Sequence, residues 1–259
     1  MTSNAAIIDC LAVFFFGMVW GSFFYTLALR VNAGDFSASS LVKSSRCPSC
    51  GTRIGYLRLV PILGYLISLG RCASCGGRIS PLYPSMEALY GIIAVALAAR
   101  YGITPDTFVL FLIAGTAICI SVIDITILAI PGHLVAVLAL LAAYPAIKAM
   151  LAVGAWSALG GVLLLGGFFL LVLLVFPGSF GGGDAKFSAA IGLAVGFEQS
   201  IVVLEVALVT GAVMGIVYAL VTKKGLRIRI PFAPFLTAGL LLSLLYGREI
   251  LMLYNRIVY

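Results

Sequence analysis

Apolar stretches recur along nearly the whole chain of 259 residues, and this repetition most constrains its fold. Apolar stretches of about 15 to 25 residues can cross a bilayer core of roughly 30 Å as helices. The stretches span residues 7–29, 86–99, 107–130, 134–147, 151–176, 185–197, 201–221 and 232–246. Charged residues make up only 10% of the chain, against about 25% in soluble domains. The sequence therefore predicts an all-α polytopic membrane protein with about eight transmembrane helices.

The distribution of lysine and arginine predicts the orientation, because short loops rich in these residues stay in the cytoplasm. The loop after the first stretch is strongly basic. Its cations are Arg30, Lys43, Arg46, Arg53, Arg58, Arg71 and Arg78. We expect this loop to be cytoplasmic and the N-terminus to lie outside. Eight crossings, rather than seven, also keep the basic cluster at 223–229 inside. Anionic lipid then accounts for most of the net charge of +7 without a nucleic acid.

The basic loop contains two Cys-x-x-Cys motifs, Cys47 with Cys50 and Cys72 with Cys75. Two such pairs, separated by about twenty residues, are typical of one tetrahedral zinc site. A loop this short buries little core, so a structural metal ion would replace the missing packing. We therefore divide the chain into a first transmembrane helix (1–30), a zinc-binding tetracysteine loop (31–83) and a transmembrane core (84–259).

Two disulfides, or a redox role for either motif, are alternatives to zinc. A reducing cytoplasm disfavours the disulfides. The redox role lacks the surrounding βαβ pattern that such motifs usually have.

Acidic residues within the apolar stretches need an explanation, because a charge at mid-bilayer costs on the order of 3 kcal/mol. Asp124 lies toward the end of the third stretch, and Asp184 lies at the entry to the sixth, after the glycines 181–183. The predicted topology brings both to the cytoplasmic side at similar depth. Two carboxyl groups that share a proton can activate water for attack on a peptide carbonyl. The alternatives are that Asp184 caps its helix and that Asp124 lies in headgroup water.

Taken together, these motifs resemble the bacterial type IV prepilin peptidases, over almost the whole chain. Residues 181–186 read Gly-Gly-Gly-Asp-Ala-Lys and are similar to the GxGD motif of that family with its following lysine. Asp124, ahead of Ile130 and Pro131, matches the other catalytic aspartate. The paired cysteines match the zinc-binding tetracysteine. The resemblance thus implies an aspartyl pair of Asp124 and Asp184, with Gly181, Gly183 and Lys186 in support.

The resemblance also implies an activity. Such enzymes are bifunctional hydrolases and methyltransferases of the bacterial inner membrane. They cut the basic leader of prepilins or pseudopilins, for type IV pili or type II secretion, at the cytoplasmic face. They then methylate the new N-terminus with S-adenosylmethionine. Glu87 is the candidate for methyl transfer, and its alternative role is that of an acid favoured by the helix dipole.

Several positions depart from the pattern of that family. Tyr25 stands where Asn is usual, Leu59 and Gly64 replace Asn and Ser around Pro61, and Gly132 replaces an Asp. Most of these positions lie in the part linked to methyl transfer, so proteolysis is the firmer expectation.

Two other classes of function compete with the protease. The acids in the apolar stretches would also suit an ion or proton transporter, although no hydropathy symmetry suggests two repeated halves. The cysteine loop would also suit an inactive zinc-knuckle scaffold of a secretion assembly.

Overall fold

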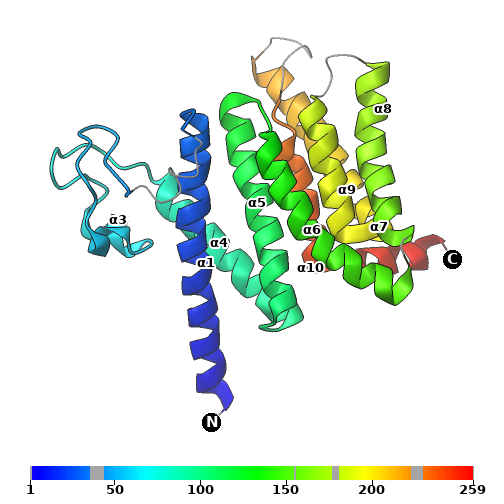
Figure 1. Cartoon of the computed structure of the whole chain (residues 1–259), viewed down its shortest axis with the longest axis horizontal. Helices are drawn as coiled ribbons and strands as arrows, with labels where there is room; N and C mark the ends of the chain where they lie inside the picture. The colour runs from blue at the N-terminus through cyan, green and yellow to red at the C-terminus, as the bar shows by residue number, and fades with distance from the viewer. Residues whose placement is uncertain (1, 36–43, 155, 177–180, 223–229, 259) are drawn as a thin grey trace. The chain divides into compact units, whose positions relative to one another are not determined.

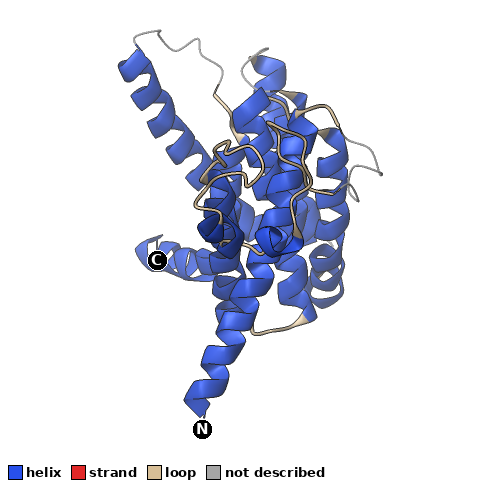
Figure 2. Ribbon diagram, turned by 90° about the vertical axis from the view of Figure 1, so that its left-hand side faces the viewer, coloured by secondary structure: helices blue, strands red, loops and turns tan. Residues whose placement is uncertain are grey.

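The computed structural model describes residues 2–35, 44–154, 156–176, 181–222 and 230–258. Among these residues every named secondary-structure element is a helix, and Figure 2 shows only helices and loops. The predicted all-helical fold is thereby confirmed. The elements form two compact units, Met1–Thr104 and Pro105–Tyr259, and each is described by itself. The sequence-based division at 30/31 and 83/84 stays a prediction.

The first unit is built on two long helices, α1 (Thr2–Asn32) and α4 (Leu82–Tyr101), which cross at close range. Glycine makes this approach possible: a Cβ on Gly17 would lie 2.7 Å from the carbonyl oxygen of Tyr90. Small residues at helix crossings let backbones approach closely in membranes. The rings of Phe24 and Tyr90 stack beside the crossing with centroids 5.4 Å apart.

The segment between α1 and α4 carries the cysteines and two short helices. These are the 3₁₀ helix η1 (Tyr56–Leu59) and α3 (Leu63–Ile67). Figure 1 shows α3 beside α1 rather than beyond its end. The segment is therefore folded back along the helix pair.

The second unit is a helical bundle in which the long helix α9 (Gly182–Thr222) packs against most of the other helices, while the largely buried α5 (Pro105–Ile127) packs against α6 and α10. A continuous helical stretch in it changes from α7 to α8 through a single π-helical turn, η2. The bounds are α5 (Pro105–Ile127), α6 (Gly132–Val153), α7 (Trp156–Gly161), η2 (Val162–Gly166), α8 (Gly167–Val175), α9 (Gly182–Thr222) and α10 (Ala233–Val258).

Helix α9 contains two helical segments that meet at Gly196, whose φ of 78° and ψ of 179° interrupt the helix. The beginning of α9 is near the end of α5, because Gly183 contacts Ile130. The later part of α9 returns to the same end, where Gly211 contacts Phe232 at the start of α10. The two segments thus run in opposite directions (Figure 1).

Seven helices among the described residues are long and apolar enough to cross a membrane. One of them is α9, which at 1.5 Å per residue would be about 60 Å long if straight, twice the bilayer core. The break at Gly196 is compatible with two crossings by α9, and hence with eight in all. The number of crossings and the orientation stay predictions, and the basic cluster at 223–229 lies outside the described residues.

Candidate active site and metal centre

Asp124 is a buried acid at the end of α5, only 5% exposed. The helix ends three residues later, just before Leu128, which adopts a positive φ of 52°. The carboxylate accepts a hydrogen bond of 3.0 Å from the backbone amide of Ala233, the first residue of α10. Free amides and the dipole at a helix N-terminus favour a negative group there. Helix α10 thus holds the carboxylate in a fixed orientation.

Two hydroxyl groups connect α10 to α5 about one helical turn before Asp124. The Ser121 and Thr237 oxygens are 2.7 Å apart, and Thr237 also donates to the Ala117 carbonyl at 3.2 Å. All of these atoms are buried. They fix the register in which the start of α10 meets Asp124.

Asp184 lies in the first turn of α9 and is half-buried. Its Oδ2 accepts a hydrogen bond of 2.9 Å from the Gly181 amide, and its own amide donates to the Gly181 carbonyl at 3.0 Å. This is the side-chain half of a capping box. The structure therefore shows the capping contact that the sequence left open, and the same contact orients the carboxyl group.

The structure brings Asp124 and Asp184 to the same end of the second unit. Gly183 makes this possible, because a Cβ there would lie only 2.9 Å from the Cβ of Ile130. The two carboxyl groups are near enough to interact electrostatically. A pair of acids at such a place can act together as acid and base toward a bound water.

Lys186 is exposed and follows Asp184 by two residues. Residues two apart on a helix do not face each other. Lys186 therefore projects from a different face of α9 than Asp184.

The four loop cysteines form one cluster. Their sulfur atoms all lie within 4.8 Å of one another, and the distance is 3.9 Å both for Cys47 to Cys75 and for Cys50 to Cys72. Four thiolates about 2.3 Å from one zinc ion would be about 3.8 Å apart, whereas bonded sulfurs are about 2.05 Å apart. The arrangement fits a tetrahedral metal site and not two disulfides.

The cluster is built from two copies of one turn. In each copy the amide of the first cysteine bonds to a carbonyl five residues later, at 2.9 Å for Cys47 and 2.8 Å for Cys72. The glycine after the second cysteine has a positive φ, 71° at Gly51 and 70° at Gly76, which glycine adopts without steric cost. The repeat Arg-Cys-x-x-Cys-Gly-x-Arg was visible in the sequence, and it predicts this shared geometry.

The surroundings of the sulfurs favour thiolates at part of the cluster. The hydroxyl of Thr52, 3.3 Å from the Cys50 sulfur, and the Thr52 amide lower the pKa of Cys50 to about 6. The Gly77 amide lowers the pKa of Cys75. The neighbouring cysteines, of which Cys50 has the largest effect, together with burial, outweigh it and raise the pKa of Cys75 to about 11. A divalent cation would displace the remaining proton and offset the clustered negative charge.

Glu87 is a buried acid in the first unit, 7% exposed, on α4. Its Oε2 accepts a hydrogen bond of 2.7 Å from the Ile62 amide, and Ser22 of α1 contributes a further one. Ile62 has a positive φ of 61°, a strained conformation for a β-branched residue. Glu87 is thus tied to the cysteine loop. Because α4 begins at Leu82, Glu87 does not lie in its first turn, and the alternative role as an acid favoured by the helix dipole is wrong.

A cavity of about 650 Å³ lies between Glu87 and the cysteine turns. Its wall includes Tyr83, Cys47 and Cys72, together with the side chains of several arginines. This volume falls in the range of small-molecule sites, about 300–1,000 Å³. The cavity offers both an acid and cations to a bound molecule.

The sequence did not predict the contacts that α10 makes at Asp124. Pro231 and Pro234 do indicate in the sequence that a helix begins there, since proline is favoured in a first helical turn. Which acid such a helix start would serve depends on a contact across 109 residues.

Comparison with known proteins covers both units. The family model of the Bacterial Peptidase A24 N-terminal domain matches residues 15–101, and that of the Type IV leader peptidase family matches residues 111–216. A protein of Bacillus subtilis (strain 168) is 32% identical over 245 residues, which cover 93% of this chain and 96% of that protein. A protein of Aeromonas hydrophila is 30% identical over 217 residues, covering 81% and 74% of the two chains. Both relatives carry the name prepilin leader peptidase/N-methyltransferase. No solved structure matches the chain.

Metal content tests the cysteine cluster. We expect the purified protein to carry about one zinc ion per chain, and Cys50→Ser to lower this content severalfold because one of four ligands is lost. Cys10→Ser is the matched control, since Cys10 lies outside the cluster. Elemental analysis and thiol titration give the answer. A wild-type protein without metal and without titratable thiols at these four positions would point to disulfides.

Proposed function

The chain belongs to the type IV leader peptidase family, and we propose that it is a membrane-embedded aspartyl endopeptidase that cleaves the leader of type IV prepilins or pseudopilins. The observation that carries the proposal is the meeting of Asp124 and Asp184 at one end of the second unit. The family does not favour the transporter or the scaffold.

The two acids divide the chemistry between them. One carboxylate takes a proton from water as the water oxygen bonds to the scissile carbonyl carbon. The other, protonated at the start, gives its proton to the leaving amine as the C–N bond breaks. The Ala233 and Gly181 amides hold the two Oδ2 atoms in place through both steps.

The proposed location is the cytoplasmic face of a bacterial inner membrane, with the N-terminus outside. The basic cysteine loop supports this orientation through the positive-inside rule. A substrate of this class has a cationic leader followed by an apolar helix. The scissile bond of such a substrate lies at the membrane boundary. Acids at the end of a bundle of transmembrane helices are well placed to reach it.

Zinc is the proposed ion of the cysteine cluster, in a structural role. The sulfur spacing and the all-cysteine ligand set support it. With four protein ligands a site has no open position for catalysis. The ion would join the two turns of a segment that buries few residues of its own.

N-methylation of the new N-terminus is the second proposed activity, because the names of the relatives pair both activities. S-adenosylmethionine would supply the methyl group from a positively charged sulfonium. In the 650 Å³ cavity, Glu87 would face that charge and the arginines would face the carboxylate of the donor.

Two departures from the family pattern have a structural consequence. A Cβ on Gly64 would lie 2.1 Å from the carbonyl oxygen of Arg58, so the usual Ser does not fit this backbone. The ring of Tyr25 packs edge-on against Tyr83, with centroids 4.9 Å apart, beside the cavity. Gly64 and Tyr83 both line the cavity, so these departures affect its wall.

Cleavage of a purified pilin precursor tests the protease. In reconstituted vesicles we expect Asp124→Asn and Asp184→Asn each to slow leader removal by about 10²–10⁴-fold or more, because each removes one proton-transfer group. Asp106→Asn is the control: Asp106 starts α5 and bonds to Tyr144 and Lys148 instead. Gel shift and mass spectrometry follow the product. Full activity in either Asn variant at the pair contradicts the proposal.

Glu87→Gln separates the two activities. The amide oxygen of Gln still accepts from Ile62, so we expect cleavage to continue while N-methylation falls by about tenfold or more with the lost charge. The mass of the mature N-terminal peptide reports both. Normal methylation in Glu87→Gln would show that Glu87 has no part in methyl transfer. An equal loss of cleavage and methylation would show that Glu87 contributes only to folding.

A further inference from the structure

Large apolar side chains project outward from residues 56–69, the segment that carries η1 and α3. Leu57 is 81% exposed, Leu66 58% and Leu69 85%. Tyr56, Leu63 and Ile67 are exposed as well. A contiguous apolar surface of this kind marks an interaction site in a protein.

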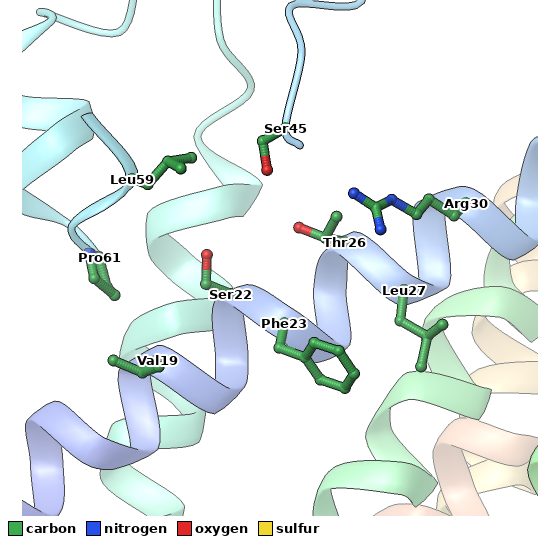
Figure 3. A pocket seen from close by; sticks show the side chains of 9 residues that line it. All are labelled: Val19, Ser22, Phe23, Thr26, Leu27, Arg30, Ser45, Leu59 and Pro61. Atoms are coloured by element: carbon green, nitrogen blue, oxygen red, sulfur yellow. The ribbon is translucent and has the colours of Figure 1, made fainter. Parts of the chain in front are cut away.

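This segment lies beside α1, well before the C-terminal end of that helix. Leu59 and Pro61 line a small cavity of about 290 Å³ together with Val19 and Ser22 of α1 (Figure 3). Ser22 precedes Asn32, the last residue of α1, by ten residues, or about 15 Å along the helix. The segment therefore lies at the level of the membrane-spanning part of α1.

The outward face of α1 at this level is itself apolar. Phe15, Phe16, Val19 and Phe23 are exposed there, on a helix long and apolar enough to span a bilayer. Leu59 and Pro61 of the segment line one small cavity with Val19 and Phe23 of this face. What covers α1 can thus cover the segment too.

The backbone around α3 suits an environment without water. In a bilayer each amide needs a partner within the protein. The amides of Gly64 and Gly70 donate to Val60 and Tyr65 at 2.8 and 3.0 Å, and that of Leu66 donates to Ile62. The amide of Ile62 itself, at the strained turn, donates to Glu87.

The charged residues within the segment and next to it in sequence are all cationic, and Glu87 of α4 is the acid that contacts it. The sequence contains no Asp or Glu between Asp35 and Glu87. Arg53 precedes η1 and Arg58 lies within it. Figure 3 shows Arg30, Thr26 and Ser45 on the polar side of the small cavity, away from Val19. Apolar side chains bordered by arginines are the pattern of an interfacial membrane anchor.

We propose that residues 56–69 insert into one leaflet of the bilayer, with Leu57, Leu66 and Leu69 among the acyl chains and Arg53 and Arg58 at anionic phospholipid headgroups. The anchor fixes the cysteine turns at the membrane surface. It also fixes the depth of the contact between Ile62 and Glu87. The inference does not depend on the proposed function.

Depth-dependent fluorescence quenching tests the anchor in the full-length protein. Trp20 and Trp156 are first replaced by Phe, and a single tryptophan is introduced as Leu66→Trp or, independently, as Leu57→Trp. Ser74→Trp, on an exposed cysteine turn, is the control. The protein is reconstituted in vesicles of phosphatidylcholine and phosphatidylglycerol, and a circular-dichroism spectrum like that of the wild type shows that each variant is folded.

We expect brominated acyl chains to quench the tryptophan at 66 and at 57, and aqueous iodide to quench the one at 74. Quenching of both 66 and 57 by iodide and not by brominated lipid would overturn the proposal. Shielding from both quenchers would also overturn it, since a second copy or another protein would then cover the segment.

The lipid headgroup is tested with the same tryptophan at 66. At equal lipid fractions, brominated phosphatidylglycerol should quench it more than brominated phosphatidylcholine, by about twofold or more. The difference should vanish in Arg53→Gln with Arg58→Gln. Equal quenching by the two lipids before that substitution would contradict the part assigned to the arginines.

Discussion

A carboxyl group buried at the end of a membrane helix needs a hydrogen-bond donor, and Asp124 finds it in the first amide of α10. That bond connects residues far apart in the chain, and the hydroxyls of Ser121 and Thr237 hold the same two helices in register. The close contact of Gly183 with Ile130 then brings Asp184 to the same end. The proposed chemistry depends on this convergence, because neither acid alone serves as both proton donor and proton acceptor.

The helices were predictable because hydropathy reports transfer into lipid, which is the dominant constraint on such a chain. The reversal within α9 followed from the prediction that residues 185–197 and 201–221 cross separately, but its position at Gly196 did not, since a single residue makes it. The cysteine cluster was predictable from the spacing of its cysteines, because all four lie within one short stretch of sequence. The bond from Ala233 to Asp124 was not, because no local pattern tells which acid a helix start will serve. The contact of Glu87 with Ile62 eluded prediction for the same reason.

The first unit combines three constraints on one short segment. Four cysteines join its two turns, Glu87 binds its strained turn from α4, and its apolar side chains face outward beside α1. A segment with few buried residues is thus held by the cysteine cluster, by one buried acid and, as we propose, by the lipid. Glu87 and the cysteine turns form part of the wall of the cavity between them.

Cross-linking of the two acid positions tests the convergence most directly. In a protein with Cys10 and Cys119 replaced by Ser, Asp124→Cys with Asp184→Cys is treated in native membranes with short bifunctional thiol reagents, while zinc protects the loop cysteines. The account predicts an internal cross-link between α5 and α9, and none for Asp106→Cys with Asp184→Cys, because Asp106 begins the helix that Asp124 ends. Failure of the first pair to react with any short reagent, although both thiols remain accessible, would contradict it.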